Sequence, residues 1–139
     1  MPDQRDRSGL DTGAQRGFDP GPLLGRSFPL STGVRVRLRF ARPTDQDGIA
    51  ALLADQGREI SAQRIGELVR FDPRRRIVIC GTALLGQAET VVAVGTIELG
   101  ADPAEPKVIV DSSVGDGLAE LVSGALVGRA RATKARRVA

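Results

Sequence analysis

The sequence predicts an α/β fold of the α+β class, in which a mainly antiparallel sheet is flanked by helices. Residues 34–40 alternate apolar and charged side chains, which is the period of a half-exposed strand. Two segments with helical period follow, and three segments rich in β-branched residues then precede a last helical segment. The predicted order is therefore strand, helix, helix, strand, strand, strand, helix. The 139 residues, of which 41% are hydrophobic, suit one small domain with a modest core.

The first strand and the two helices after it have recognisable boundaries. In residues 34–40 the arginines fall on one face, and we expect that face to be solvated. Thr44 is expected to cap the first helix, which ends near Gly57. Ser61 begins the second helix, and Pro73 lies just beyond its end.

The next two strands are predicted to form a hairpin. Residues 77–84 and 91–99 are the strands, and residues 85–90, which include Gly86, are the loop. A third strand, residues 108–110, follows an acidic link and leads into the last helix.

Both ends of the chain differ in composition from the middle. Residues 1–33 are rich in Gly, Pro, Asp, Arg and Ser and show no sustained period, so we expect a disordered N-terminal arm and a folded domain of residues 34–139. Residues 129–139 carry four Arg and one Lys with no acid, and we expect the last helix to continue past Gly128 into them.

Several function classes are disfavoured by composition. With no histidine and Cys80 as the one cysteine, the chain supplies no zinc site and no Ser-His or Cys-His pair, and Cys80 is expected to be a buried thiol in a cytoplasmic protein. Four Phe without Tyr or Trp make nucleic-acid binding unlikely despite the pI near 10.0. No apolar run is long enough to span a membrane. The arginines of residues 74–76 could hold a phosphate or form a solvated strand entrance.

The stretch from Lys107 to Ala130 reads as strand, glycine turn and helix. Gly115 and Gly117 flank Asp116 directly before the helical period begins at Leu118. Such a turn points the free N–H groups and the positive end of a helix toward an anion the size of a phosphate. The same two glycines also suit a tight connection without a ligand, and the sequence leaves both readings open.

These segments together resemble the GNAT family of acyl-CoA-dependent N-acyltransferases. The resemblance lies in the stretch from Val34 to Asp45, in the hairpin with Ala93 to Leu99, and in the stretch from Val108 to Leu118. Members of the family bind the coenzyme pyrophosphate with a loop of Arg or Gln, two residues, Gly, any residue, and Gly or Ala, placed before the helix that follows the fourth strand. The resemblance implies a GNAT-like sheet, acetyl-CoA as acyl donor without a metal, and an amine acceptor of unknown identity. The coenzyme-binding residues that it implies are Val108, Val110, Ser112, Ser113, Val114, Gly115, Asp116, Gly117 and Leu118.

Two features depart from the family pattern. Ser112 stands where the family has Arg or Gln, and Asp116 places a negative charge beside the expected pyrophosphate. The resemblance also stops where the fifth strand of the family would begin, and the chain has no tyrosine to act as general acid. An alternative is therefore a catalytically incomplete GNAT remnant that serves as a protein-interaction or regulatory module, with a second copy or another protein completing the fold.

Two carboxylates are candidates for the base that acyl transfer requires. Attack of an amine on a thioester needs proximity, proton removal and N–H groups near the carbonyl oxygen. Glu98 and Asp111 have suitable positions near the ends of their strands. Each could equally be a surface or capping carboxylate.

Overall fold

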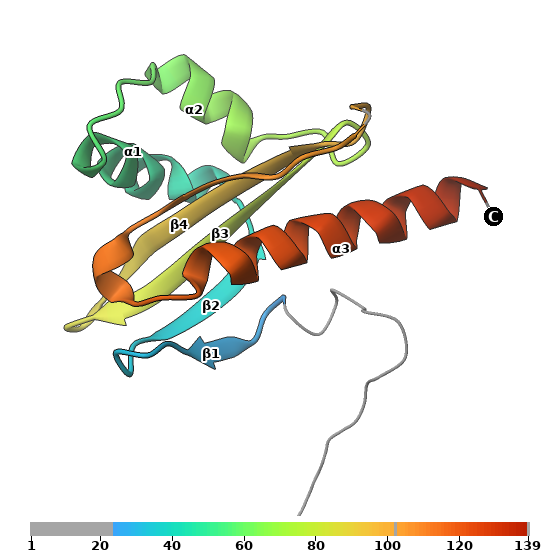
Figure 1. Cartoon of the computed structure of the whole chain (residues 1–139). Coiled ribbons are helices and arrows are strands. Elements are labelled where there is room, and N and C mark those ends of the chain that lie inside the picture. Colours follow the sequence, from blue (N-terminus) through green and yellow to red (C-terminus); the bar gives the residue numbers. More distant parts are fainter. Residues whose placement is uncertain (1–23, 102, 139) are drawn as a thin grey trace, which may run out of the picture.

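The computed structural model describes residues 24–101 and 103–138, with side chains as far as Lys134. In this part of the chain five strands form one antiparallel sheet in the order β1-β2-β3-β4-β5. Figure 1 shows α1 and α2 on one face of this sheet and α3 on the other. The elements are β1 (Ser27–Pro29), β2 (Arg35–Phe40), the 3-10 turn η2 (Pro43–Asp45), α1 (Gln46–Asp55), α2 (Ala62–Val69), β3 (Arg76–Leu85), β4 (Ala88–Glu98), β5 (Lys107–Val110), the 3-10 turn η3 (Ser112–Val114) and α3 (Leu118–Val138). The predicted class, an α+β fold with a mainly antiparallel sheet, is confirmed.

The sheet separates two hydrophobic cores. On the α3 side, Leu118, Val122 and Leu126 pack against apolar residues of β2, β3 and β4. On the other side, Ile49 of α1 and Ile65 of α2 pack against the opposite face of β3 and β4. Both faces are thus covered by helices, as expected for a sheet with apolar residues on both faces.

The alternation in β2 has the predicted consequence. Val36 and Leu38 are fully buried in the core on the α3 side, whereas Arg35 and Arg37 are exposed. Arg39 is the exception, because its guanidinium is mostly buried against Asp45.

The predicted N-cap residue is correct for α2 and wrong for α1. Ser61 is the N-cap of α2 and accepts a hydrogen bond from Arg64 N at 3.1 Å, as expected. Thr44 does not cap the first helix. The turn η2 precedes α1, and Asp45 is the N-cap residue of α1, but its side chain makes no capping bond to that helix. The Asp45 carboxylate instead accepts the Arg42 N–H at 2.7 Å, at the start of η2.

The hairpin is longer than predicted. β3 and β4 pair from Arg76↔Glu98 to Leu85↔Ala88, which leaves Gly86 and Gln87 as a two-residue turn. Gly86 has φ +68°, a conformation that such turns require and that glycine adopts without strain. The expected loop of residues 85–90 is therefore mostly strand.

The N-terminal boundary lies earlier than predicted. β1 pairs with β2 within the expected arm of residues 1–33, and Leu30 is buried in the core on the α3 side. Burial of Leu30 supplies the apolar area that this segment was expected to lack. The expected disorder of residues 1–23 concerns residues outside the described range and stays a prediction.

The last helix extends past Gly128 to Val138, as predicted. It lies close to the sheet because β4 has a glycine at the crossing point. A Cβ on Gly95 would lie 2.7 Å from Val122 Cγ1 and 2.8 Å from Leu126 Cδ1, which is too close for any side chain. Of the helices described, none is long and apolar enough to cross a membrane.

Candidate functional site

β5 forms one edge of the sheet, where its outward backbone groups face no other strand among the residues that the structure describes. It pairs with β4 in the register Val108↔Gly95 and Val110↔Ala93, and Asp111 donates its N–H to Val92 O at 2.8 Å. In an antiparallel pair the residues that bond to the neighbour alternate. The register therefore directs the N–H and C=O groups of Val108 and Val110 away from β4, to the open edge.

The side chains of β5 alternate between the two cores. Val108 and Val110 pack on the α3 side, and Ile109 packs on the side of α1 and α2. All three side chains are only partly buried, because no strand covers this edge in the part of the chain that is described.

The turn η3 connects β5 to the glycine turn. Asp111 is its N-cap and accepts hydrogen bonds from Ser113 N at 3.0 Å and from the Ser113 hydroxyl at 2.6 Å. The side chains of Ser112 and Ser113 are exposed, whereas that of Val114 is buried in the core on the α3 side. The side chain of Val114 is therefore unavailable to a ligand, and its N–H already donates to Asp111 O at 3.2 Å.

The two glycines of the turn, Gly115 and Gly117, differ in the space around their Cα atoms. Gly115 has φ +136°, and a Cβ there would lie 3.0 Å from Leu30 Cβ and 3.2 Å from Thr32 Oγ1. The positive φ and these close neighbours both favour glycine at this position. Gly117 has φ +91°, and a Cβ there would meet nothing within 4 Å. The space beside Gly117, at the start of α3, is open.

The turn between β1 and β2 holds the glycine turn in place. The Thr32 hydroxyl donates to Val114 O, and Asp116 donates its N–H to Ser31 Oγ at 3.4 Å. No local sequence pattern predicts these contacts, because they join segments more than 80 residues apart that no periodicity relates. The Asp116 side chain itself is exposed, so water screens its charge.

The first turn of α3 has the free N–H groups expected of a helix start. Leu121 donates to Gly117 O at 3.0 Å, which is the first intrahelical bond, so the N–H groups just before Leu121 have no partner within the helix. Leu118 is 1% exposed, and its side chain belongs to the core. Leu118 could therefore contact a ligand only through its backbone.

Comparison with solved structures gives a match over most of the chain. The crystal structure of the GNAT domain of S. lividans PAT superposes with a TM-score of 0.63 at 14% sequence identity, covering 78% of this chain and 72% of that chain. The chain has a GNAT fold. No protein-family model and no curated protein matches the sequence.

Along the chain β5 is followed by η3, the glycine turn and α3, which is the order that the resemblance to the GNAT family predicts for the strand, loop and helix of a coenzyme site. The predicted coenzyme-binding residues thus form one continuous segment, from the edge of β5 to the start of α3. β1 is an addition to the element order that the sequence predicts.

The two candidate bases do not come together. Glu98 lies at the end of β4, where it forms an ion pair with Arg76 at 2.5 Å. Asp111 lies opposite Val92, six residues back along β4, so about 20 Å of strand separates the two carboxylates. Only Asp111 lies next to the glycine turn.

A cavity near Asp111 lies between the sheet and α1. Its volume is about 420 Å³, and its lining carries four carboxylates, those of Asp45, Asp55, Glu89 and Asp111, and two arginines, Arg39 and Arg42. Because Asp45 neutralises Arg39, the remaining lining is acidic. This cavity would favour a cationic ligand.

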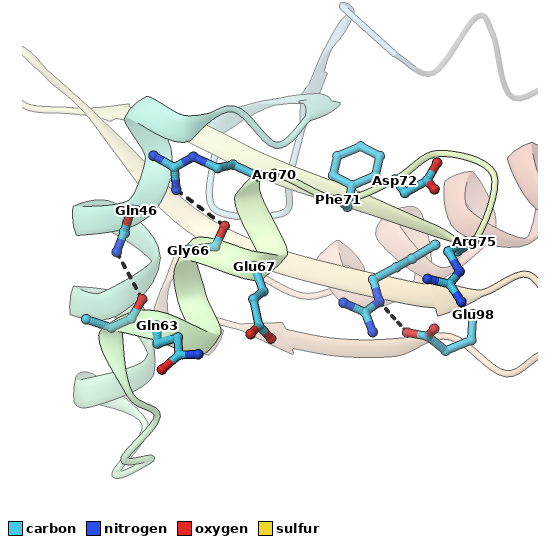
Figure 2. Close-up of a pocket in the computed structure, with 11 residues that line it drawn as sticks. Gln46, Gln63, Gly66, Glu67, Arg70, Phe71, Asp72, Arg75 and Glu98 are labelled. Carbon is cyan, nitrogen blue, oxygen red and sulfur yellow. Dashed lines mark hydrogen bonds and ion pairs between the residues drawn. The ribbon is translucent and has the colours of Figure 1, made fainter.

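A larger cavity lies at the opposite end of the sheet, beside α2. It has a volume of about 980 Å³ and holds both signs of charge, including Glu67, Arg70 and Glu98. Figure 2 shows these side chains around it, and the dashed line at Glu98 marks the ion pair with Arg76. The mixed charge indicates no particular ligand. Of the three arginines of residues 74–76, which the sequence offers as a phosphate site, Arg75 and Arg76 line this cavity and Arg74 does not.

One ion pair is buried beneath the α1 face. Arg39 donates two hydrogen bonds of 2.7 Å to the Asp45 carboxylate, which is 5% exposed. Burial opposes ionisation of Asp45, but the hydrogen bonds from Arg39 and the Arg42 N–H outweigh it, so the pKa of Asp45 lies below its usual value. The hydrogen bond to Asp45 in turn raises the pKa of Arg39.

Cys80 is buried in the core between the sheet and the helices α1 and α2. Burial raises the pKa of its thiol to about 12, so it stays protonated at neutral pH and is no nucleophile. The prediction of a buried thiol is confirmed. Among the residues with described positions, no group of three or more Cys, Asp or Glu side chains could hold a metal ion.

Proposed function

We propose that this protein is an acyl-CoA-dependent N-acyltransferase that transfers an acetyl group from acetyl-CoA to an amine. The observation that carries the proposal is the outward-facing edge of β5, which leads through η3 directly to the open side of Gly117 and the start of α3. One continuous segment could thus hold both the amide-containing arm and the diphosphate of the coenzyme.

Binding divides between two kinds of backbone group. The N–H and C=O groups of Val108 and Val110 would pair with the amides of the pantetheine arm, as an added strand would. The free N–H groups at the start of α3, together with the helix dipole, would hold the diphosphate. The position of Ser112 lacks the Arg or Gln of the family, so these backbone groups carry the anion largely by themselves.

The chemistry asks for a base near the thioester. The neutral amine attacks the thioester carbonyl, a C–N bond forms, the C–S bond breaks, and the thiolate of coenzyme A leaves. The amine proton passes to a base, and the thiolate takes up a proton from solvent. Asp111 is the better candidate, because the acidic cavity beside it would attract a protonated amine, whereas Glu98 is engaged with Arg76.

The test is calorimetric titration of acetyl-CoA into variants of the glycine turn. Gly117→Val should abolish binding, because its side chain would fill the space beside the helix start. The control is Gly86→Val, which introduces comparable backbone strain at φ +68° in open space of the hairpin turn, outside the segment of residues 108–118, and should leave binding unchanged. Asp116→Asn should tighten binding, by an amount that shrinks as salt is raised.

Equal effects of Gly117→Val and Gly86→Val on binding would contradict the proposal, since both would then act through stability. If the wild-type protein does not bind acetyl-CoA at millimolar ligand, the proposed function is wrong.

A second candidate is a GNAT module that does not catalyse acyl transfer and serves as a protein-interaction or regulatory domain. The observation that favours it is the engagement of both candidate bases, Asp111 as a cap of η3 and Glu98 with Arg76. Binding of acetyl-CoA without release of free coenzyme A in the presence of varied amines would support this candidate. For either function we propose a cytoplasmic location, in keeping with the single reduced cysteine.

A further inference from the structure

The two edges of the sheet differ in how they are protected. β1 has three residues and ends in Pro29, and both a short length and a proline discourage pairing with another chain. β5 is also short, with four residues, and begins with the exposed Lys107, but it contains no proline. Its outward backbone groups at Val108 and Val110 have no strand beside them among the described residues. In Figure 1 this strand is the orange segment that runs between α1 and α2 on one side and α3 on the other.

We infer that a second copy of this chain pairs with the open edge of β5, so that two β5 strands join antiparallel about a twofold axis at Ile109. The inference does not depend on the proposed function. It extends the five-stranded sheet across the dimer.

The backbone of β5 is complementary to itself in this register. With Ile109 on the axis, Val108 of one copy lies opposite Val110 of the other. Both residues direct N–H and C=O to the edge, so each of these two pairs exchanges two hydrogen bonds, as a regular antiparallel ladder requires. A shift by one residue would place the inward-bonded groups of Ile109 in the ladder and lose this match.

The charges that flank the strand are also complementary. In the same register Lys107 lies opposite Asp111 of the other copy, and both side chains fall on the face toward α1, where Asp111 lines a cavity. Lys107 is exposed and forms no ion pair with any side chain described. Asp111 uses Oδ1 for its capping bonds to Ser113, which leaves Oδ2 for a lysine.

Pairing would also cover apolar surface. The side chains of Val108, Ile109 and Val110 are all partly exposed, although their partners Ala93 and Val94 in β4 are buried. Because β5 has only four residues, the interface is small and we expect a weak dimer, with Kd on the order of 10 to 100 µM.

Sedimentation equilibrium of charge-swapped variants tests the register. Lys107→Glu places a carboxylate opposite Asp111 of the other copy, and Asp111→Lys places two lysines opposite each other. Each variant alone should dimerise about tenfold more weakly than the wild type. An equimolar mixture of the two should regain the wild-type affinity, because both flanking pairs are attractive in the mixed dimer.

The Asp111→Lys variant also loses the cap of η3, so Val110→Pro serves as a second route. Proline there removes an N–H that points to the open edge and takes no bond from the β4 ladder, so the fold is retained and the dimer is lost. Circular dichroism of each variant verifies folding.

A wild-type protein that stays monomeric up to about 1 mM would overturn the inference, given the affinity expected for this small interface. So would dimerisation of Val110→Pro at wild-type strength, or a mixture of folded charge-swapped variants that associates no better than either alone.

Addition of acetyl-CoA separates this inference from the proposed function. Coenzyme bound along β5 uses the same backbone groups, so it should dissociate the dimer. A dimer that forms as described and ignores acetyl-CoA would count against the proposed function and leave the inference intact.

Discussion

Leu30→Ala tests whether the β1–β2 turn belongs to the folded domain. Leu30 is 8% exposed and packs in the core on the α3 side, and its backbone closes the turn through bonds of 2.8 Å to Val34 and Gly33. Truncation of a buried leucine to alanine costs about 2 to 5 kcal/mol of unfolding free energy. Because Leu30 lies at the margin of the core, we expect a value near the lower end, about 2 to 3 kcal/mol. For a domain of this size the midpoint of thermal unfolding should fall by roughly 8 to 12 °C.

Differential scanning calorimetry of Leu30→Ala and Leu84→Ala measures this directly. Leu84 is 69% exposed in the hairpin, so its truncation removes the same atoms with little loss of burial and should cost less than about 0.5 kcal/mol. A chain that begins at Val34 should lose at least as much stability as Leu30→Ala. Equal melting temperatures for the two alanine variants would refute the placement of Leu30 in the core.

The remaining prediction concerns the buried ion pair. Asp45→Ala should lower the unfolding free energy by about 3 kcal/mol at neutral pH, because it leaves the Arg39 charge buried, and Arg39 Nε already lacks a partner among the described residues. Since the pKa of Asp45 is depressed in the fold, the wild type keeps this stabilisation above the unfolded-state pKa of about 4 and loses it as the pH falls further, through the folded-state pKa. Urea titrations should show the two proteins converging under acid conditions, and a difference that stays constant down to about pH 2 would contradict this account.

The fold was predictable where one face of an element is apolar and the other polar. The alternation in residues 34–40 and the cap at Ser61 are local signals, and both agree with the structure. β1 was missed because three residues ending in Pro29 are too short to show a period, and their place in the sheet depends on pairing with β2. The hairpin strands are longer than the sequence predicts. Polar residues near Glu89 suggest a loop, but the exposed ends of strands tolerate polar residues.

The sequence predicts where the candidate site lies along the chain, but not which distant residues hold it in place. The glycine pair marks the turn before α3 in the sequence itself. The close contact of Gly115 with Leu30 and Thr32, and the open space beside Gly117, follow only from packing between distant segments. The separation of Glu98 from Asp111 likewise depends on strand register, which places them at different points along β4.

The central claim is that the edge of β5 and the glycine turn bind acyl-CoA through their backbone. Titration of acetyl-CoA into isotope-labelled protein, followed by backbone amide NMR, tests it most directly. We expect the largest shifts at the outward amides of Val108 and Val110 and at Gly117, with little change at Gly86 in the hairpin turn. Shifts confined to the α2 cavity around Glu67 and Arg70, or no shifts at millimolar ligand, would contradict it.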